Sequence, residues 1–259
     1  MKYKIEKNTV QETLIIPLYA RKVCSELYPN LYRDETAVRL IDEIDYDFSE
    51  AEKNSRGLMQ RFGSLEVAVR QNDLAFEVRD YLKSHPNAAV VNLGCGLDST
   101  GRSCDNGSCK IYNLDFPDVI AVRNELLPAG EREENIPCDL NNTEWFGKID
   151  SSNGAVFFAS GVFYYFLTEQ VKALVQGMAD AFPGGVLVFD AANRTAVKMI
   201  AKTWLKSAKI QDVGAYFAVS DAPQEISAWD SRLQVTSRGY MLGYTDLKDP
   251  SVSGFFRFL

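Results

Sequence analysis

The sequence predicts an α/β fold: a Rossmann-like, mostly parallel sheet with antiparallel strands at its edge, preceded by an N-terminal helical cap. Two patterns support this class. Short apolar runs alternate with helical segments from residue 88 onward, which is typical of the right-handed crossovers that build a parallel sheet. The first 85 residues instead carry helical periodicity with no strand alternation. We therefore expect a single domain over residues 1–259, with 1–85 as the cap and 86–259 as the α/β core.

Three helices are expected in the cap. Residues 12–27 and 34–44 repeat apolar side chains at helical spacing, and Asp34 is placed to cap the second of these helices. Residues 61–82 form the third helix, with Gly63 as a candidate break. Each helix needs a surface on which to bury its apolar face, and the sheet that follows provides one.

The strands of the core follow in order. The expected strands are the apolar runs 88–93, 110–115, 134–139, 154–160 and 185–190. The clearest helix between them is 168–182, where Thr168 is a candidate N-cap and Val171, Val175 and Met178 lie on one apolar stripe. This stripe is expected to face the core.

The last part of the chain has a different composition. Residues 215–219, 234–242 and 254–259 are rich in aromatic and β-branched side chains. Such residues favour strands, so we expect these segments to form antiparallel strands at the edge of the sheet.

The most informative motif begins at the end of the first core strand. The apolar run 90–93 suits a strand buried on both faces, and Gly94 and Gly96 end it. Glycine lets the backbone turn sharply and lets a ligand lie against the main chain, since no Cβ blocks its approach. Asp115 closes the next strand nineteen residues after Gly96, the place from which a carboxylate accepts hydrogen bonds from ribose hydroxyls. The spacing predicts a nucleotide-cofactor site.

The loop after these glycines narrows the choice of cofactor. A pyrophosphate-binding loop adds a third small residue and then a helix N-terminus. Here that position is Ser99, and the polar, glycine-rich segment 100–107 leaves room for only a short helix. A cofactor with a ribose but no phosphates, such as S-adenosylmethionine, needs the glycines and the carboxylate but no phosphate cradle. The segment favours S-adenosylmethionine over a nicotinamide dinucleotide, and a chance Gly-x-Gly in another α/β strand is the third interpretation.

Composition restricts the partners. The chain has 28 Lys and Arg against 35 Asp and Glu, a net charge of −7, with no basic run suited to nucleic acid. No apolar run is long enough to span a bilayer, and the first residues lack a signal-peptide core. We expect a cytoplasmic protein, monomeric or homodimeric, that acts on a small molecule and not on nucleic acid or a membrane.

The cysteines and the histidine limit metal and base chemistry. Five scattered cysteines, an odd number, argue against a disulfide framework. Cys104 and Cys109 could reach one metal ion, but no further residues complete a four-ligand set, so no metal is expected. His85 is the only histidine, and it stands at an expected helix end, where a solvated or capping role is simplest. A mechanism with a histidine base therefore depends on His85.

Several motifs occur together along the chain. They are residues 17–22 (PLYARK), 32–37 (YRDETA), 70–73 (RQND), 91–98 (VNLGCGLD), 114–117 (LDFP) and 138–140 (CDL). Together they resemble the S-adenosylmethionine-dependent leucine carboxyl methyltransferases and their bacterial relatives that O-methylate polyketide-type carboxylic acids. The resemblance implies a class I methyltransferase fold, S-adenosylmethionine as cofactor, and a cap that closes over the acceptor as a substrate lid.

The resemblance also implies roles for individual residues. Arg70 holds the methionyl carboxylate, for which a guanidinium fork is well suited, and the two glycines line the methionyl group. Asp115 holds the ribose hydroxyls, and Asp139 with Leu140 meets the adenine. The complete set of cofactor-binding residues expected is Arg70, Gly94, Cys95, Gly96, Asp98, Asp115, Phe116, Asp139, Leu140 and Ser160.

The chain departs from the family pattern at two places. Relatives continue the glycine motif with Asp-Thr-Arg, whereas Arg102 here comes four residues after Asp98, which makes it a candidate substitute for the family arginine. Relatives also carry a glutamate at the end of the fourth strand, where this chain has Ser160. Loss of that carboxylate raises the alternative of weakened or lost activity.

These observations predict an O-methyltransferase that forms methyl esters on a small-molecule carboxylic acid. A carboxylate acceptor is already ionised at neutral pH, so alignment is the main requirement and no histidine base is needed. A hydroxyl acceptor would need a base or a hydrogen-bonding tyrosine. No catalytic residue is assigned, and the acceptor-side candidates are Tyr164, Tyr165 and Ser160. The alternatives are a non-catalytic binder of S-adenosylmethionine or nucleosides, and a protein C-terminal carboxyl methyltransferase.

Overall fold

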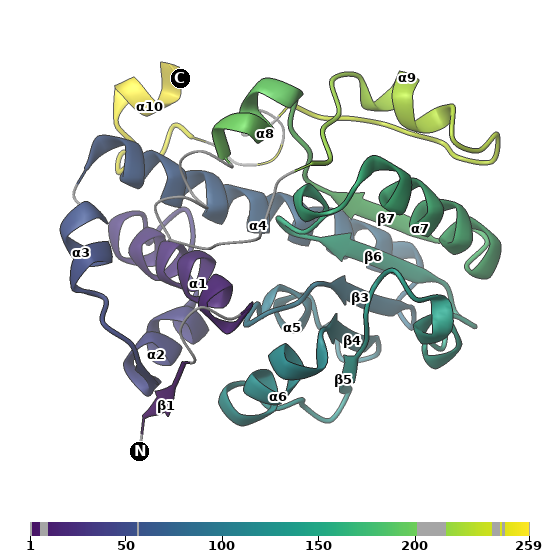
Figure 1. The fold of residues 1–259 in the computed structure, drawn as a ribbon, viewed down its shortest axis with the longest axis horizontal. Helices are drawn as coiled ribbons and strands as arrows, with labels where there is room; N and C mark the ends of the chain where they lie inside the picture. Colours follow the sequence, from purple (N-terminus) through teal and green to yellow (C-terminus); the bar gives the residue numbers. More distant parts are fainter. Residues whose placement is uncertain are drawn as a thin grey trace.

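A parallel five-stranded sheet forms the centre of the molecule (Figure 1). The computed structural model describes residues 2–5, 10–55, 57–200, 216–239, 244 and 247–258. The strands are β3 (Ala89–Leu93), β4 (Lys110–Asp115), β5 (Glu133–Pro137), β6 (Ala155–Ala159) and β7 (Val186–Phe189), in the order β5-β4-β3-β6-β7. Every pair in this sheet is parallel. The five expected core strands and the Rossmann-like fold class are therefore confirmed.

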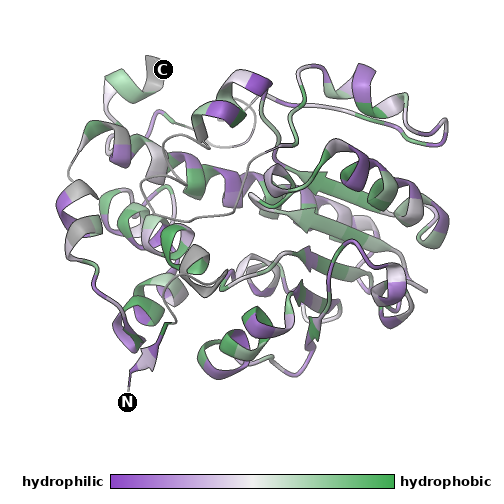
Figure 2. Ribbon diagram, viewed as in Figure 1, coloured by the Kyte–Doolittle hydropathy of each residue, from purple (hydrophilic) through white to green (hydrophobic). Residues whose placement is uncertain are grey.

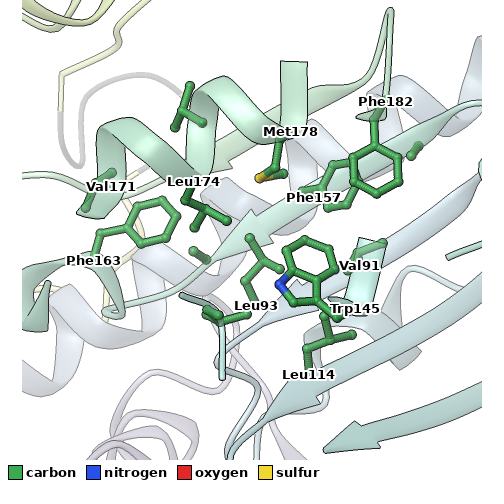
Figure 3. Packing of buried hydrophobic residues seen from close by; sticks show 14 of the residues in the cluster. Val91, Leu93, Leu114, Trp145, Phe157, Phe163, Val171, Leu174, Met178 and Phe182 are labelled. Atoms are coloured by element: carbon green, nitrogen blue, oxygen red, sulfur yellow. The ribbon is translucent and has the colours of Figure 1, made fainter. Parts of the chain in front are cut away.

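Both faces of the sheet are covered, because the central strands β3 and β6 are buried at every position. Figure 2 shows the centre of the sheet as mostly hydrophobic. Alternate residues point to opposite faces. On one face, Val91 and Phe157 pack against Leu174 and Met178 of helix α7 (Thr168–Ala181) and against Trp145 of the 3-10 helix η1 (Thr143–Lys148) (Figure 3). The stripe of α7 therefore belongs to the core, as expected.

The opposite face carries the long helix α4 (Leu58–Ser84). Leu74, Val78 and Leu82 of this helix share one buried cluster with Val90 and Phe158 of the sheet. Helix α4 is continuous through Gly63, so the expected break there is wrong. The C-terminal half of α4 thus packs on the sheet, and its N-terminal half extends into the cap.

The order of the strands defines where a ligand can bind. From β3 the chain runs through α5 (Thr100–Ser103), β4 and α6 (Pro117–Leu126) to β5, and then returns to place β6 on the other side of β3. Such a reversal leaves a crevice at the carboxyl ends of the two central strands. In this sheet the reversal point lies between β3 and β6, directly after Leu93 and Ala159, and we call this edge of the sheet the crevice.

The cap lies at one end of the molecule (Figure 1) and is made of α1 (Val10–Leu27), α2 (Glu35–Glu43), α3 (Ser49–Ser55) and the start of α4. Asp34 caps α2 as predicted, because its side chain accepts a hydrogen bond from the Ala37 amide. Leu18 and Leu40 of the cap share a buried cluster with Leu97 of the core. The cap also contains a two-residue parallel pair, β1 (Tyr3–Lys4) with β2 (Ile44–Asp45), which the helical periodicity did not predict.

The described part of the tail differs from expectation. Residues 216–219 and 234–239 form no strand, and the chain instead makes α9 (Ala222–Ser227) and α10 (Gly254–Phe258). Residues 215, 240–242 and 259 lie outside the described residues. The aromatic residues of the tail are buried without strand pairing. Phe217 joins the cluster under α7, and Phe256 packs against the cap. The prediction of antiparallel strands is therefore wrong for the segments that the structure describes.

The remaining helices are short. They are η2 (Phe163–Tyr165) after β6 and α8 (Arg194–Ile200) after β7. Thr168 is the first residue of α7 and Leu167 is its N-cap, one residue before the cap expected from the sequence. Within the described residues, none of the helices combines the length and apolarity that a membrane span requires.

Candidate functional site

The glycine loop after β3 lies at the crevice between the two central strands. Gly94 and Gly96 have φ of +65° and +46°, in the left-handed region that favours glycine. A Cβ on Gly94 would lie 2.7 Å from Cγ2 of Val162, in the loop after β6. A Cβ on Gly96 would lie 3.0 Å from Cδ2 of Leu14, in the cap. The bare backbone of the loop therefore lies directly against the cap and the β6 loop.

Asp115 is fixed by the glycine loop. Its Oδ2 accepts a 2.7 Å hydrogen bond from the Gly96 amide, and its Oδ1 accepts a 2.8 Å hydrogen bond from the Phe116 amide. A carboxylate has about four acceptor positions, so these two contacts orient Asp115 and leave acceptor capacity for hydroxyl groups. Burial raises its pKa above the ordinary value, despite the two amide donors.

Asp98 acts inside the loop. Its carboxylate accepts hydrogen bonds from the amide of Thr100 at 2.9 Å, the hydroxyl of Thr100 at 2.7 Å and the side chain of Asn92 at 3.1 Å. These contacts form the turn into the short helix α5. Cys95 is 1% exposed, and burial raises the pKa of its thiol. The structure thus gives Asp98 a role in loop shape and places Cys95 inside the fold.

Two buried arginines hold the carbonyl side of the loop. Nη1 of Arg123, on α6, donates to the carbonyls of Gly96 at 2.9 Å and Asp98 at 2.7 Å. Nη2 of Arg21, on α1, donates to the Leu97 carbonyl at 3.0 Å, and its Nε pairs with Asp34 at 2.9 Å. Sequence reasoning assigned a role to neither residue, although Arg21 lies within the motif of residues 17–22. Arg123 lies one turn after Ile120 on the buried stripe of α6, and a charged residue at such a position indicates a buried partner.

The predicted adenine-binding residues follow β5, next to Asp115. The Cys138 amide donates to the Asp115 carbonyl at 2.8 Å, which holds the two strand ends together. Oδ1 of Asp139 accepts hydrogen bonds from the amide and the side chain of Asn141, at 2.9 and 3.0 Å, and so forms a turn. Leu140 is buried, whereas Phe116 is 43% exposed at the start of α6. Asp139 and Phe116 therefore lie at the surface beside Asp115.

The other side of the crevice contains a charged pair. Nη1 of Arg70 lies 3.3 Å from Oδ2 of Asp190, the first residue after β7. Oδ1 of Asp190 accepts a 2.6 Å hydrogen bond from the Gly161 amide. Ser160 Oγ is buried and makes no hydrogen bond to the described residues. Sequence reasoning missed Asp190, because nothing in a single sequence pairs residues 120 positions apart.

Tyr165 lies within reach of the charges on Arg70 and Asp190. Burial of its phenol group raises its pKa, although 43% of the residue surface is exposed. Its hydroxyl therefore stays protonated at neutral pH and acts as a hydrogen-bond donor. Tyr164 is 8% exposed, and its carbonyl accepts a hydrogen bond from the Tyr216 amide at 2.7 Å. Of the two tyrosines, Tyr165 is the one open to a ligand.

The other residues singled out from the sequence lie away from the loop. Arg102 pairs with Glu133 at 2.6 Å and donates to the Pro128 carbonyl at 2.7 Å. His85 is the C-cap of α4, and its carbonyl accepts from Ala88 just before β3, at the opposite end of the sheet. No group of three or more metal-ligating side chains occurs in the part of the chain that the structure describes.

A parallel sheet with a reversal point, a glycine loop and a carboxylate on the next strand is the arrangement with which Rossmann-like folds bind nucleotide cofactors. The family model described as leucine carboxyl methyltransferase matches residues 16–179, and the chain belongs to this family. The resemblance stated from the motifs is confirmed, and so is S-adenosylmethionine as the cofactor of the class.

Known relatives agree with this assignment. The chain is 28% identical over 183 residues to the tetracenomycin polyketide synthesis O-methyltransferase TcmP of Streptomyces glaucescens, a match to 70% of this chain and 66% of that protein. It is 25% identical over 258 residues to the S-adenosyl-L-methionine-dependent methyltransferase dpfgK of Gibberella zeae, covering 93% of this chain and 85% of that one. The match thus spans just under two thirds of the length of the Streptomyces relative.

The fold is also similar to a solved structure. A protein of Thermobifida fusca described as a candidate methyltransferase superimposes with a TM-score of 0.52 at 19% identity, over 81% of this chain and 78% of that chain. At this identity the likeness concerns the fold alone.

Proposed function

We propose that this chain transfers a methyl group from S-adenosylmethionine to an oxygen of a small-molecule carboxylic acid, forming a methyl ester. The observation that carries the proposal is the chemistry around Tyr165. The charge of the Arg70 guanidinium acts on the protonated phenol of Tyr165, whereas the chain's one imidazole is at the opposite end of the sheet. A hydrogen-bond donor with no base beside it suits an acceptor oxygen that is already ionised, while the guanidinium serves the carboxylate of the cofactor.

The residues at the crevice fit the cofactor. Asp115 would hold the ribose hydroxyls through its remaining acceptor capacity, and Gly94 and Gly96 would let the ligand lie against the main chain. Arg70 would hold the methionyl carboxylate, close to the buried hydroxyl of Ser160, which has no hydrogen-bond partner among the described residues. Bound S-adenosylmethionine supplies a methyl group activated by a positively charged sulfur. The helix after the loop has only four residues, so a pyrophosphate would find no helix N-terminus of useful length.

The side chains of this site align and orient an acceptor more readily than they deprotonate one. A carboxylic acid loses its proton well below neutral pH, whereas a phenol keeps its proton to about pH 10. Tyr165 would donate a hydrogen bond to an acceptor carboxylate, which fixes the direction of its oxygen. The name of the Streptomyces relative, a polyketide O-methyltransferase, supports a polyketide-like small molecule as the acceptor.

The helical cap would close over this acceptor as part of a single methyltransferase domain. Leu14 of the cap touches the place where a Gly96 side chain would be. Arg21 ties the cap to the loop through the Leu97 carbonyl. The cap is therefore in direct contact with the loop on which the cofactor would lie, which supports its role as a lid.

Product chemistry tests the proposal. The purified protein is incubated with methyl-labelled S-adenosylmethionine and three acceptor sets: polyketide-like carboxylic acids, phenols of matched size, and peptides that end in a free leucine. We expect label only with the small acids, and its release as methanol on mild alkali, because esters hydrolyse in base and aryl ethers do not. Alkali-stable label would identify a hydroxyl acceptor, and label on peptides a protein carboxyl methyltransferase. Cofactor binding with no turnover of any set would favour a non-catalytic binder.

A further inference from the structure

The carboxylate of Asp190 follows directly after the last residue of β7. Strands β6 and β7 are parallel, and Ala159 pairs with Phe189 at their last position. The next residues, Ser160 and Asp190, therefore leave neighbouring strands at the same level of the sheet. The carboxylate at this level of the sheet therefore belongs to Asp190, on the strand next to Ser160.

Asp190 joins the two elements that meet here. Its Oδ1 receives the Gly161 amide at 2.6 Å, and its Oδ2 faces Nη1 of Arg70 at 3.3 Å. The side chains of Asp190 and Arg70 are 5% and 14% exposed. Burial of both charges requires that they compensate each other, because an isolated buried charge is costly.

Gly161 completes the arrangement. Its φ is +69°, and a Cβ at this position would lie 2.9 Å from Nη1 and 3.1 Å from Nη2 of Arg70. The guanidinium therefore packs against the bare backbone of Gly161, while Asp190 holds both the amide of Gly161 and the end of the guanidinium. The contact with Asp190 is made at the Nη1 end of the guanidinium.

We propose that Asp190 is a positioning residue that holds Arg70 against Gly161 and directs the guanidinium at the amino-acid end of the cofactor. The inference rests on the proposed function. Asp190 acts through Arg70, so it serves the amino-acid end of the ligand and has no part in holding the adenosine end, which Asp115 serves from the other side of β3.

Two ligands distinguish the amino-acid end of the cofactor site from its adenosine end. S-Adenosylhomocysteine has both the adenosine and the amino-acid group, whereas 5′-methylthioadenosine has only the adenosine. Asp190→Asn keeps the size of the side chain and an oxygen for the Gly161 amide, but removes the charge that holds Arg70. By calorimetric titration we expect about tenfold weaker binding of S-adenosylhomocysteine, the usual size of one charged hydrogen bond, and a change within about twofold for 5′-methylthioadenosine.

A matched control removes the same charge elsewhere. Asp230 is a partly buried carboxylate of the tail that pairs with Arg232 at 2.6 Å, and Asp230→Asn should leave both affinities unchanged. Arg70→Met supplies the second test, because it removes the positive charge that Asp190 is proposed to position. In the Arg70→Met background, Asp190→Asn should weaken the binding of S-adenosylhomocysteine no further.

The outcomes separate this inference from the proposed function. Equal losses for both ligands would assign Asp190 to general structure, and an unchanged S-adenosylhomocysteine affinity would remove its role altogether. Additive effects of the two substitutions would show that Asp190 does not act through Arg70. Each of these results overturns the inference while the wild-type protein still binds both ligands. A wild-type protein that binds neither ligand would instead overturn the proposed function.

Discussion

The two sides of the crevice are built from different kinds of contact. On the β4 side, Asp115 is held by backbone amides of Gly96 and Phe116, which are near it in the sequence or on the adjacent loop. On the β6 and β7 side, Arg70 meets a carboxylate 120 residues away, and the two charges lie together only because α4 crosses the sheet. The first side is a local motif with fixed spacing, and the second is a product of tertiary packing.

The two sides of the crevice should therefore respond to different substitutions. Backbone amides stay in place when a neighbouring side chain changes, so the β4 side depends on its single carboxylate and on the glycine conformation. The Arg70 side depends on two side chains that must remain buried together. Substitutions that act on one side only, or on the glycine between them, should therefore have distinct effects on stability and on ligand binding.

The largest effect is expected where the two sides meet, at Gly94. Gly94→Ala combines a left-handed φ of +65° with a Cβ only 2.7 Å from Val162. Strain and overpacking together should cost about 3 kcal/mol of the free energy of unfolding, measured by urea denaturation. Gly107→Ala is the matched control, since Gly107 also has positive φ but no atom within 4 Å of the added Cβ. It should cost about 1 kcal/mol, and equal losses for both variants would show that Val162 yields without cost.

The next largest effect is the loss of ligand affinity expected on substitution of Asp115. Asp115→Ala removes the acceptor for the ribose hydroxyls and also releases the Gly96 amide. We expect about 100-fold weaker binding, or about 2.7 kcal/mol, for S-adenosylhomocysteine and 5′-methylthioadenosine alike. The equal loss contrasts with the selective loss expected for Asp190→Asn. Calorimetric titration checks both ligands, and an unchanged affinity would overturn the assignment of the ribose site.

The same contrast explains how far the sequence could predict the molecule. The five strands and Asp115 follow from local apolar runs and from one spacing, and the structure places them as predicted. Asp190 and Arg123 carry no local pattern of their own, because their partners are distant in the chain or are backbone carbonyls. The prediction of strands in the tail is wrong for a related reason. Phe217 and Phe256 cover the sheet cluster and the cap, and composition alone does not distinguish such packing from a strand.

A pH dependence should appear at the Asp115 side. Burial raises the pKa of Asp115, so this carboxylate takes up a proton at higher pH than an ordinary aspartate, whose pKa is about 3.9. Ligand affinity should be full above the raised pKa and fall as the pH drops through it. The free fold should respond in the opposite direction, since a raised pKa makes protonation favour the folded state. Asp115→Asn should abolish the pH dependence of binding, and a slope that persists in this variant would assign it to another group.

The smallest effect is expected at Arg102, which tests whether the altered loop supplies a cofactor ligand of its own. Its guanidinium pairs with Glu133 and the Pro128 carbonyl, on the β5 side and away from the glycines. Arg102→Met should therefore change S-adenosylhomocysteine affinity by no more than about twofold, while the loss of this partly exposed ion pair costs about 1 kcal/mol of the free energy of unfolding. Titration and urea denaturation of the same sample measure both quantities. A tenfold loss of affinity with little change in stability would mean that Arg102 leaves Glu133 for the ligand, and that the β4 side also depends on a mobile charge.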